Sequence, residues 1–251
     1  MAKPISLQLY TLREAAKDDF PRVLKKVADI GYVGVEFAGL QGHDPKEIRK
    51  LIDDLGLKVS SSHTGLPTAE NIQQLAETEK TLGNKKVISG FGPDKFQTVD
   101  GVKDAAEKFR TAAKLVKPFG MTYGFHNHWW EFHSVDGKQV YDILMAEAPD
   151  IFSELDVYWC AYGKADPVAV VSKYKSRLPV LHIKDGMLGE DKIHTAVGSG
   201  ALDMPAIIGA ADPNVLEWII VELDNYAGDM FEAVQSSYDY LIGNGLAAGN
   251  K

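Results

Sequence analysis

Residues 179–185 read PVLHIKD, a short run in which the aliphatic Leu181 and Ile183 alternate with the polar His182 and Lys184. An alternation with a period of two is typical of a β-strand. This run is one of eight short β-branched or aliphatic runs along the chain. Together they predict strands over residues 5–10, 33–37, 57–62, 86–89, 121–128, 151–156, 179–184 and 218–223.

Longer amphipathic segments lie between and after these runs. They predict helices over residues 18–29, 45–55, 68–82, 99–118, 140–148, 167–175, 204–210 and 230–243. Asp44-Pro45 and Asp166-Pro167 each resemble an N-cap followed by proline at the first helical position. Eight strands alternating with eight helices predict an α/β fold of the (β/α)8 type, a TIM barrel.

A doubly wound open sheet is the alternative architecture. It usually has fewer strands, and a dinucleotide-binding version needs a glycine-rich first turn that this chain lacks. Because the chain contains no linker and no low-complexity segment, we expect a single barrel domain over residues 1–251.

The composition excludes several classes of protein. The only cysteine is Cys160, which rules out a disulfide framework and argues against a thiolate-rich metal site. The net charge is −8 and the basic residues form no stripe, so a nucleic-acid partner is not expected. No apolar run suits a signal peptide or a membrane span. We expect a cytoplasmic protein, although an exported form with its leader removed would have the same sequence.

The apolar residues of each strand identify the face that packs on the helices, so the polar residues between them face the barrel interior. This alternation predicts that a set of polar side chains points inward near the carboxyl ends of the strands, where active sites of this fold lie. The set comprises Gln8, Tyr10, Glu36, His126, His128, Asp156, His182, Lys184, Glu222 and Asp224. Each could be an ordinary buried polar group with a partner, but gathering several carboxylates in one mouth is costly unless a cation compensates.

A divalent metal would provide that compensation. Three carboxylates and one imidazole, from Glu131, Asp156, His182 and Glu222, form an oxygen-rich set that suits Mn²⁺ or Mg²⁺, with Co²⁺ or Zn²⁺ as further candidates. We expect Glu131 to be the ligand that follows the fifth strand, with His126 or His128 in its place as the alternative.

Seven segments in order carry a family likeness: LQLYTLR (7–13), GYVGVEF (31–37), SSHTGL (61–66), HNHWWEF (126–132), ELDVYW (154–159), LHIKD (181–185) and IIVELD (219–224). Together they resemble the sugar phosphate isomerase/epimerase family, with its xylose-isomerase-like TIM barrel. The resemblance implies a divalent metal held by Glu, Asp, His and Glu from strands five to eight. It also implies a carbohydrate substrate and isomerase, epimerase, inosose dehydratase or 3-keto-glycoside β-elimination chemistry. Endonuclease IV is a distant relative, and His63 could mimic one of its zinc ligands, but the acidic charge argues against DNA.

The shared chemistry is removal of a proton next to a carbonyl, with a metal stabilising the enediolate. We expect His126 and His128 to transfer protons or orient the substrate, and Lys184 to stabilise oxyanion charge. The alternative for Lys184 is a salt bridge to Asp185 or Glu154. Substrate contacts are expected from Gln8, Glu36, His63, Trp129 and Trp159. The tryptophans could instead serve packing or a homo-oligomer contact.

Other interpretations fit less well. The HxHxxE stretch resembles part of a cupin motif, but cupins are all-β. An amidohydrolase-like barrel has its HxH on the first strand, where this chain has Leu7-Gln8-Leu9. A noncatalytic sugar-binding barrel stays open. The absence of an arginine cluster favours a nonphosphorylated substrate, although the VGSG turn at 197–200 could offer backbone amides to an anion.

Overall fold

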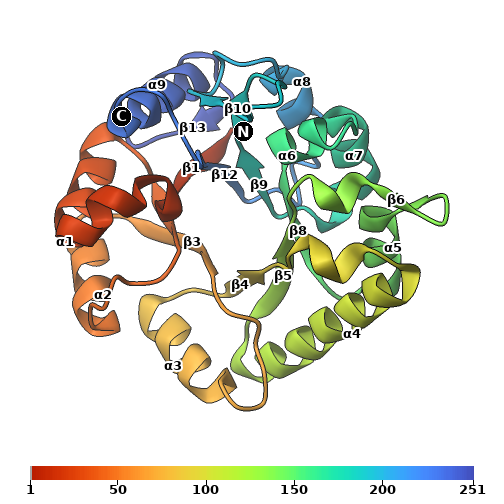
Figure 1. Ribbon diagram of the computed structural model, residues 1–251. Coiled ribbons are helices and arrows are strands. Elements are labelled where there is room, and N and C mark those ends of the chain that lie inside the picture. Colours follow the sequence, from red (N-terminus) through yellow and green to blue (C-terminus); the bar gives the residue numbers. More distant parts are fainter. Residues whose placement is uncertain (1) are drawn as a thin grey trace.

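Eight parallel strands close into a barrel in the computed structural model, which describes residues 2–251 (Figure 1). The strands are β1 (Lys3–Gln8), β2 (Gly34–Phe37), β3 (Lys58–His63), β4 (Lys86–Ser89), β5 (Thr122–His126), β8 (Phe152–Asp156), β9 (Val180–Ile183) and β12 (Trp218–Val221). The barrel is closed because β12 pairs in parallel with β9 on one side and with β1 on the other. The predicted (β/α)8 barrel is therefore confirmed.

A ring of helices surrounds the strands (Figure 1). It contains α1 (Arg13–Ile30), α2 (Pro45–Asp54), α3 (Ile72–Leu82), α4 (Val99–Val116), α5 (Val140–Glu147), α6 (Val157–Tyr162), α7 (Pro167–Tyr174), α8 (Met204–Gly209) and α9 (Met230–Gly243). The two predicted Asp-Pro starts are confirmed: Asp44 accepts the Lys46 N–H, and Asp166 accepts the Val168 N–H. No helix of residues 2–251 is long and apolar enough to cross a membrane.

Three local features differ from the expectation. Helix α1 begins five residues before the predicted start at residue 18, but its backbone breaks at Asp19 (φ −155°, ψ 86°), whose side chain caps the Arg22 N–H. The short helix α6 follows β8 directly, because the Asp156 carboxylate accepts the Trp159 N–H. Two small hairpins lie in the segments that follow β5 and β9, β6 (Ser134–Val135) with β7 (Lys138–Gln139) and β10 (Asp185–Gly186) with β11 (His194–Thr195).

The core has two parts that follow the predicted strand phase. Leu181, Ile183, Ile219 and Val221 belong to the large apolar layer between strands and helices. Val180 and Ile220 form a separate small cluster with Ile88. His182 and Glu222 follow Val180 and Ile220 by two residues and so share their inward face. The barrel interior is therefore apolar at the amino ends of these strands and polar at their carboxyl ends.

Candidate active site

Four buried side chains meet at the carboxyl ends of β5, β8, β9 and β12. His126, Asp156, His182 and Glu222 each offer one donor atom, and the four atoms all lie within 4.8 Å of one another. His126 Nε2 lies 3.5 Å from Asp156 Oδ2 and 3.9 Å from Glu222 Oε2, and His182 Nδ1 lies 3.0 Å from Glu222 Oε2. We call these residues the four-donor group.

The four-donor group has the properties of a cation site. Among the described residues, His126 Nε2 is a buried polar atom without a hydrogen-bond partner, which is costly unless something binds it. Asp156 Oδ2 makes no hydrogen bond either and has the Lys184 ammonium, at 3.0 Å, as its ion-pair partner. Ligand atoms that sit 2.0–2.2 Å from a common metal are separated from one another by about 3.0–3.5 Å. The observed separations are close to that range. Two imidazoles with two carboxylates suit Mn²⁺, Fe²⁺, Co²⁺ or Zn²⁺, so the residues fit a divalent metal.

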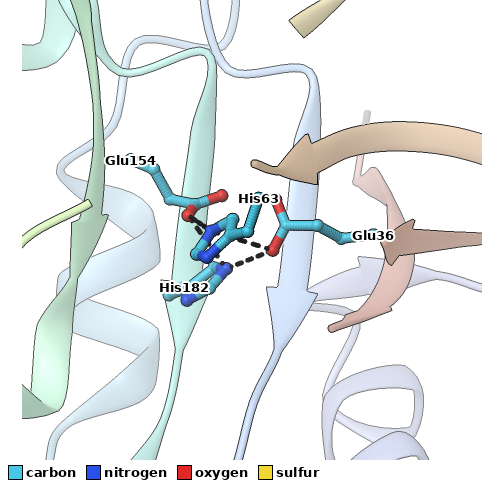
Figure 2. A group of neighbouring side chains, drawn as sticks. All are labelled: Glu36, His63, Glu154 and His182. Carbon is cyan, nitrogen blue, oxygen red and sulfur yellow. Dashed lines mark hydrogen bonds and ion pairs between the residues drawn. The ribbon is translucent and has the colours of Figure 1, made fainter. Parts of the chain in front are cut away.

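A second group lies deeper in the barrel and shares His182. Figure 2 shows Glu36, His63, Glu154 and His182 converging, and we call them the inner network. His182 Nε2 lies 2.6 Å from Glu36 Oε2 and 3.2 Å from Glu154 Oε2, while His63 Nε2 hydrogen-bonds Glu154. Contacts as short as the one to Glu36 are those of hydrogen bonds. The inner network therefore fixes the orientation of His182, as carboxylates behind a metal-binding histidine commonly do.

From the sequence, Glu154 was considered only as a salt-bridge partner of Lys184 and not as a member of the site. It lies on β8 two residues before Asp156, so both carboxylates point into the barrel. Burial opposes its ionisation, but His182 and His63 hold the pKa of Glu154 well below its usual value. The strand phase that identified Asp156 applies equally to Glu154 and could have found it.

Glu131 does not join the four-donor group. It lies on the 3-10 turn η4 (Trp130–Phe132), where its Oε2 accepts the backbone N–H of His128 at 2.8 Å. Burial raises the pKa of Glu131 to about 8. Glu131, the ligand expected after the fifth strand, thus lies outside the four-donor group, and the alternative His126 lies within it.

A cavity of about 430 Å³ opens above the four-donor group. Its lining consists of Tyr10, Ala38, His63, Thr64, His126, His128, Glu222 and Asp224. The His128 ring stacks on Trp130, with centroids 4.1 Å apart, and its Nδ1 is buried without a partner. Burial lowers the pKa of His128 to about 3, so the imidazole is neutral. His63 and His128 thus reach the cavity as expected.

Gln8 and Glu36 were expected to contact substrate, but neither lines the cavity. Gln8 is fully buried, donates to Glu36 Oε2 and accepts the Tyr10 N–H. Glu36 also accepts a hydrogen bond from Ser61. These two residues support His182 from behind instead.

The two tryptophans expected to bind a sugar ring also lie outside the cavity lining. Trp129 and Trp159 pack on each other, with ring centroids 4.7 Å apart. The Lys192 ammonium lies 3.7 Å from the centroid of the Trp129 ring. Their contacts are those of packing at the barrel mouth, the alternative considered from the sequence.

Lys184 is completely buried directly after β9. Its Nζ lies 2.6 Å from Asp224 Oδ2, 2.8 Å from Glu222 Oε2 and 3.0 Å from Asp156 Oδ2. These carboxylates differ from the Asp185 and Glu154 considered as salt-bridge partners. Lys184 does not line the cavity, so the geometry gives it no direct contact with a substrate oxyanion.

The backbone amides of the VGSG turn are occupied. The buried Asp185 carboxylate accepts the N–H groups of Gly198 at 2.9 Å and Gly200 at 3.0 Å, together with those of Gly186 and Leu202. These backbone N–H groups already bind one anion, the Asp185 carboxylate, so they are not available to a second. The suggested use of this turn for a substrate anion is therefore corrected.

Comparison with known proteins agrees with the fold. The family model for the xylose isomerase-like TIM barrel matches residues 24–242. An inosose dehydratase of Geobacillus kaustophilus is 24% identical over 81% of this chain and 79% of its own. A sugar phosphate isomerase/epimerase from Parabacteroides distasonis has a structure with a TM-score of 0.82 and 28% identity, over 99% of this chain and 96% of that one.

A structure of the IolI protein with a bound zinc atom also shares the fold. It has a TM-score of 0.76 and 16% identity, covering 97% of each chain. The family model spans most of the sequence, and the strands that carry the four-donor group lie within the matched residues. This chain belongs to the xylose isomerase-like TIM barrel family.

Proposed function

We propose that this protein is a divalent-metal-dependent isomerase or epimerase that acts on a nonphosphorylated keto-sugar or cyclitol by moving a proton next to a carbonyl. The observation that carries the proposal is the four-donor group, in which the buried His126 Nε2 has no hydrogen-bond partner, beneath a cavity walled by two further histidines. The enzyme class is supported by relatives named as isomerases, epimerases and dehydratases.

His126, Asp156, His182 and Glu222 would hold the metal, and Mn²⁺ is our first candidate. When bound, a divalent ion at this place would act as a Lewis acid toward a carbonyl and a neighbouring hydroxyl. The zinc of the IolI neighbour supports a metal in this fold. Within the chain, Glu36 and Glu154 hold the Nε2 side of His182, which leaves Nδ1 facing the four-donor group.

His128 and His63 are the candidates for proton transfer. His126 lies between them, since its ring centroid is 5.1 Å from that of each. The stack on Trp130 fixes the His128 ring, and its unpartnered Nδ1 can accept a hydrogen bond that orients the substrate for proton transfer, while its low pKa makes it a weak base. His63 is held by Glu154 and is partly exposed to the cavity, so it can donate to or accept from a substrate oxygen. Two histidines flanking one site suit the transfer of a proton between neighbouring carbons.

The cavity favours an uncharged carbohydrate. The described residues that line it include carboxylates, imidazoles and hydroxyls but no arginine or lysine. Phosphate recognition in proteins normally uses arginine, lysine or free backbone amides. The amides of the VGSG turn already bind Asp185.

Dehydration is the second candidate. The curated relatives, named inosose dehydratases, are 24% and 20% identical to this chain. Elimination of water from a keto-cyclitol also begins with removal of a proton next to the carbonyl. The same cavity histidines can therefore serve either reaction, and the fate of the neighbouring hydroxyl separates the two.

The test is incubation of ketoses, inososes and 3-keto-glycosides in D₂O with the Mn²⁺-loaded protein, followed by NMR. Exchange of a carbon-bound proton without loss of water supports the isomerase or epimerase, whereas a new double bond supports the lyase. His128→Ala should retain Mn²⁺ and lose exchange, and His43→Ala, outside the cavity, should retain both. A protein that binds Mn²⁺ and sugar without exchange would be the noncatalytic sugar-binding barrel instead. Absence of metal binding would refute the proposal.

A further inference from the structure

Lys184 lies beside the proposed metal site and pairs with three carboxylates. Its side chain is completely buried, and its ammonium contacts Asp156, Glu222 and Asp224 at 3.0 Å or less. A buried ammonium is stable only when it is paired, and buried carboxylates have the same requirement. Lys184 therefore supplies the positive charge that allows these carboxylates to lie together in the barrel.

The Lys184 ammonium contacts two carboxylate oxygens of the four-donor group. Asp156 Oδ2 and Glu222 Oε2, which lie nearest to His126 Nε2, are the same oxygens that contact Lys184 Nζ. A divalent ion bound by these oxygens would have the lysine ammonium as a neighbouring positive charge. Like charges this close repel strongly in a buried site.

We propose that Lys184 is an internal cation that neutralises Asp156 and Glu222 in the metal-free protein and competes with the metal for them. The inference rests on the metal site proposed above. Lys184 keeps the metal-free barrel folded, and it weakens metal binding so that the ion exchanges rather than being held permanently. On metal binding the ammonium gives up these two oxygens and keeps its third partner, Asp224.

Asp224 is placed to be that third partner. Its contact with Nζ is the shortest of the three, and its side chain is 29% exposed at the edge of the cavity. Its backbone is held on both sides, since its N–H donates to His194 Nδ1 and its carbonyl accepts from Arg13. A fixed carboxylate on the far side draws the ammonium away from the metal ligands.

Opposite effects are therefore expected from two substitutions. Lys184→Met removes the competing charge, so the dissociation constant for Mn²⁺ should fall by about tenfold or more. The melting temperature of the metal-free protein should fall at the same time, because the carboxylates lose their counter-ion. Asp224→Asn removes the partner that draws the ammonium away, so Mn²⁺ should bind more weakly. In the double variant the effect of Asp224→Asn should be smaller, because Asp224 acts through Lys184.

The experiment measures free Mn²⁺ by its electron paramagnetic resonance signal, and the melting temperature in EDTA. Lys173→Met is the matched control, because it removes an exposed ammonium that pairs with Asp142 at 2.7 Å on the surface. Tighter binding in Lys184→Met and weaker binding in Asp224→Asn support the inference. Unchanged or weaker binding in Lys184→Met overturns it and makes Lys184 a residue that only positions the ligands.

Two further outcomes are also decisive. If Lys184→Met does not fold in EDTA but folds with Mn²⁺, the role as internal cation is supported, and Asp224→Asn still tests the competition. If the unaltered protein binds no Mn²⁺, the proposed metal site fails and the inference fails with it. Binding by the unaltered protein without opposite effects in the two variants refutes the inference alone.

Discussion

The side-chain amide of Asn127 forms two hydrogen bonds with the backbone of Asp156, in the way that the next residue of a paired β-strand would. Asn127 Oδ1 accepts the Asp156 N–H at 3.0 Å, and its Nδ2 donates to the Asp156 carbonyl at 3.3 Å. The regular pairing of β5 with β8 ends one residue earlier, at His126 and Glu154. The Asn127 amide thus continues the ladder and fixes His126 and His128 relative to Asp156.

Replacement of Asn127 by leucine should destabilise the protein and disturb the site together. The change removes the acceptor of the buried Asp156 N–H, and an unsatisfied buried donor costs about 1–3 kcal/mol. Urea unfolding in EDTA should show the loss, and Mn²⁺ affinity should fall because His126 and Asp156 are no longer held together. Asn214→Ala, at an exposed position, is the control. Unchanged Mn²⁺ affinity in a destabilised Asn127→Leu would restrict Asn127 to a structural role.

The positions of the inward polar residues on the strands were predictable because strand periodicity is local. Once Leu181 and Ile183 are assigned to the helix side, His182 must face inward, and the same reasoning places Asp156 and Glu222. The meeting of these residues then follows from the closed barrel, which the alternation of strands and helices predicted.

The parts that were not predictable lie beyond the strand ends. The choice between His126 and Glu131 depends on the turn η4, which directs Glu131 back to the His128 N–H, and no periodic signal encodes that turn. Lys184 was identified as inward, but its role depends on three carboxylates brought from β8 and the end of β12. Contacts of this kind come from tertiary packing rather than from local sequence.

The choice of fifth-strand ligand can be tested by metal content. We expect His126→Ala to lower the affinity for Mn²⁺ by more than about tenfold, because it removes one of four donors. Glu131→Gln should leave the affinity unchanged, because Glu131 lies outside the four-donor group. Equilibrium dialysis followed by metal analysis measures both. The reverse result would return the ligand role to Glu131.

Glu131 should make stability depend on pH. Its pKa is about 8 in the folded protein against 4.5 as the ordinary value, so the folded state keeps a proton that the unfolded state releases between these values. The contribution of Glu131 to the free energy of unfolding is therefore full below the ordinary pKa and falls by up to about 1.4 kcal/mol per pH unit as the pH rises toward 8. Urea unfolding in EDTA from about pH 5 to pH 8 measures this slope. In Glu131→Gln the slope should be smaller by that amount, and an identical slope would show that Glu131 is ionised when folded.

We expect the stability of the loop that follows β9 to depend on the close approach of the Asp185 carboxylate to Gly200. A Cβ at Gly200 would lie within 2.5 Å of the Gly186 nitrogen and closer still to the Asp185 carboxylate, so Gly200→Ala must displace the carboxylate or the backbone that binds it. We expect a loss of about 2 kcal/mol or more, because buried amide donors lose their acceptor. Hydrogen exchange should also become faster in residues 186–202 than in the barrel strands. Gly209→Ala is the matched control, since a Cβ there meets no atom within 4 Å. Equal effects of the two alanines would show that Asp185 does not organise this loop.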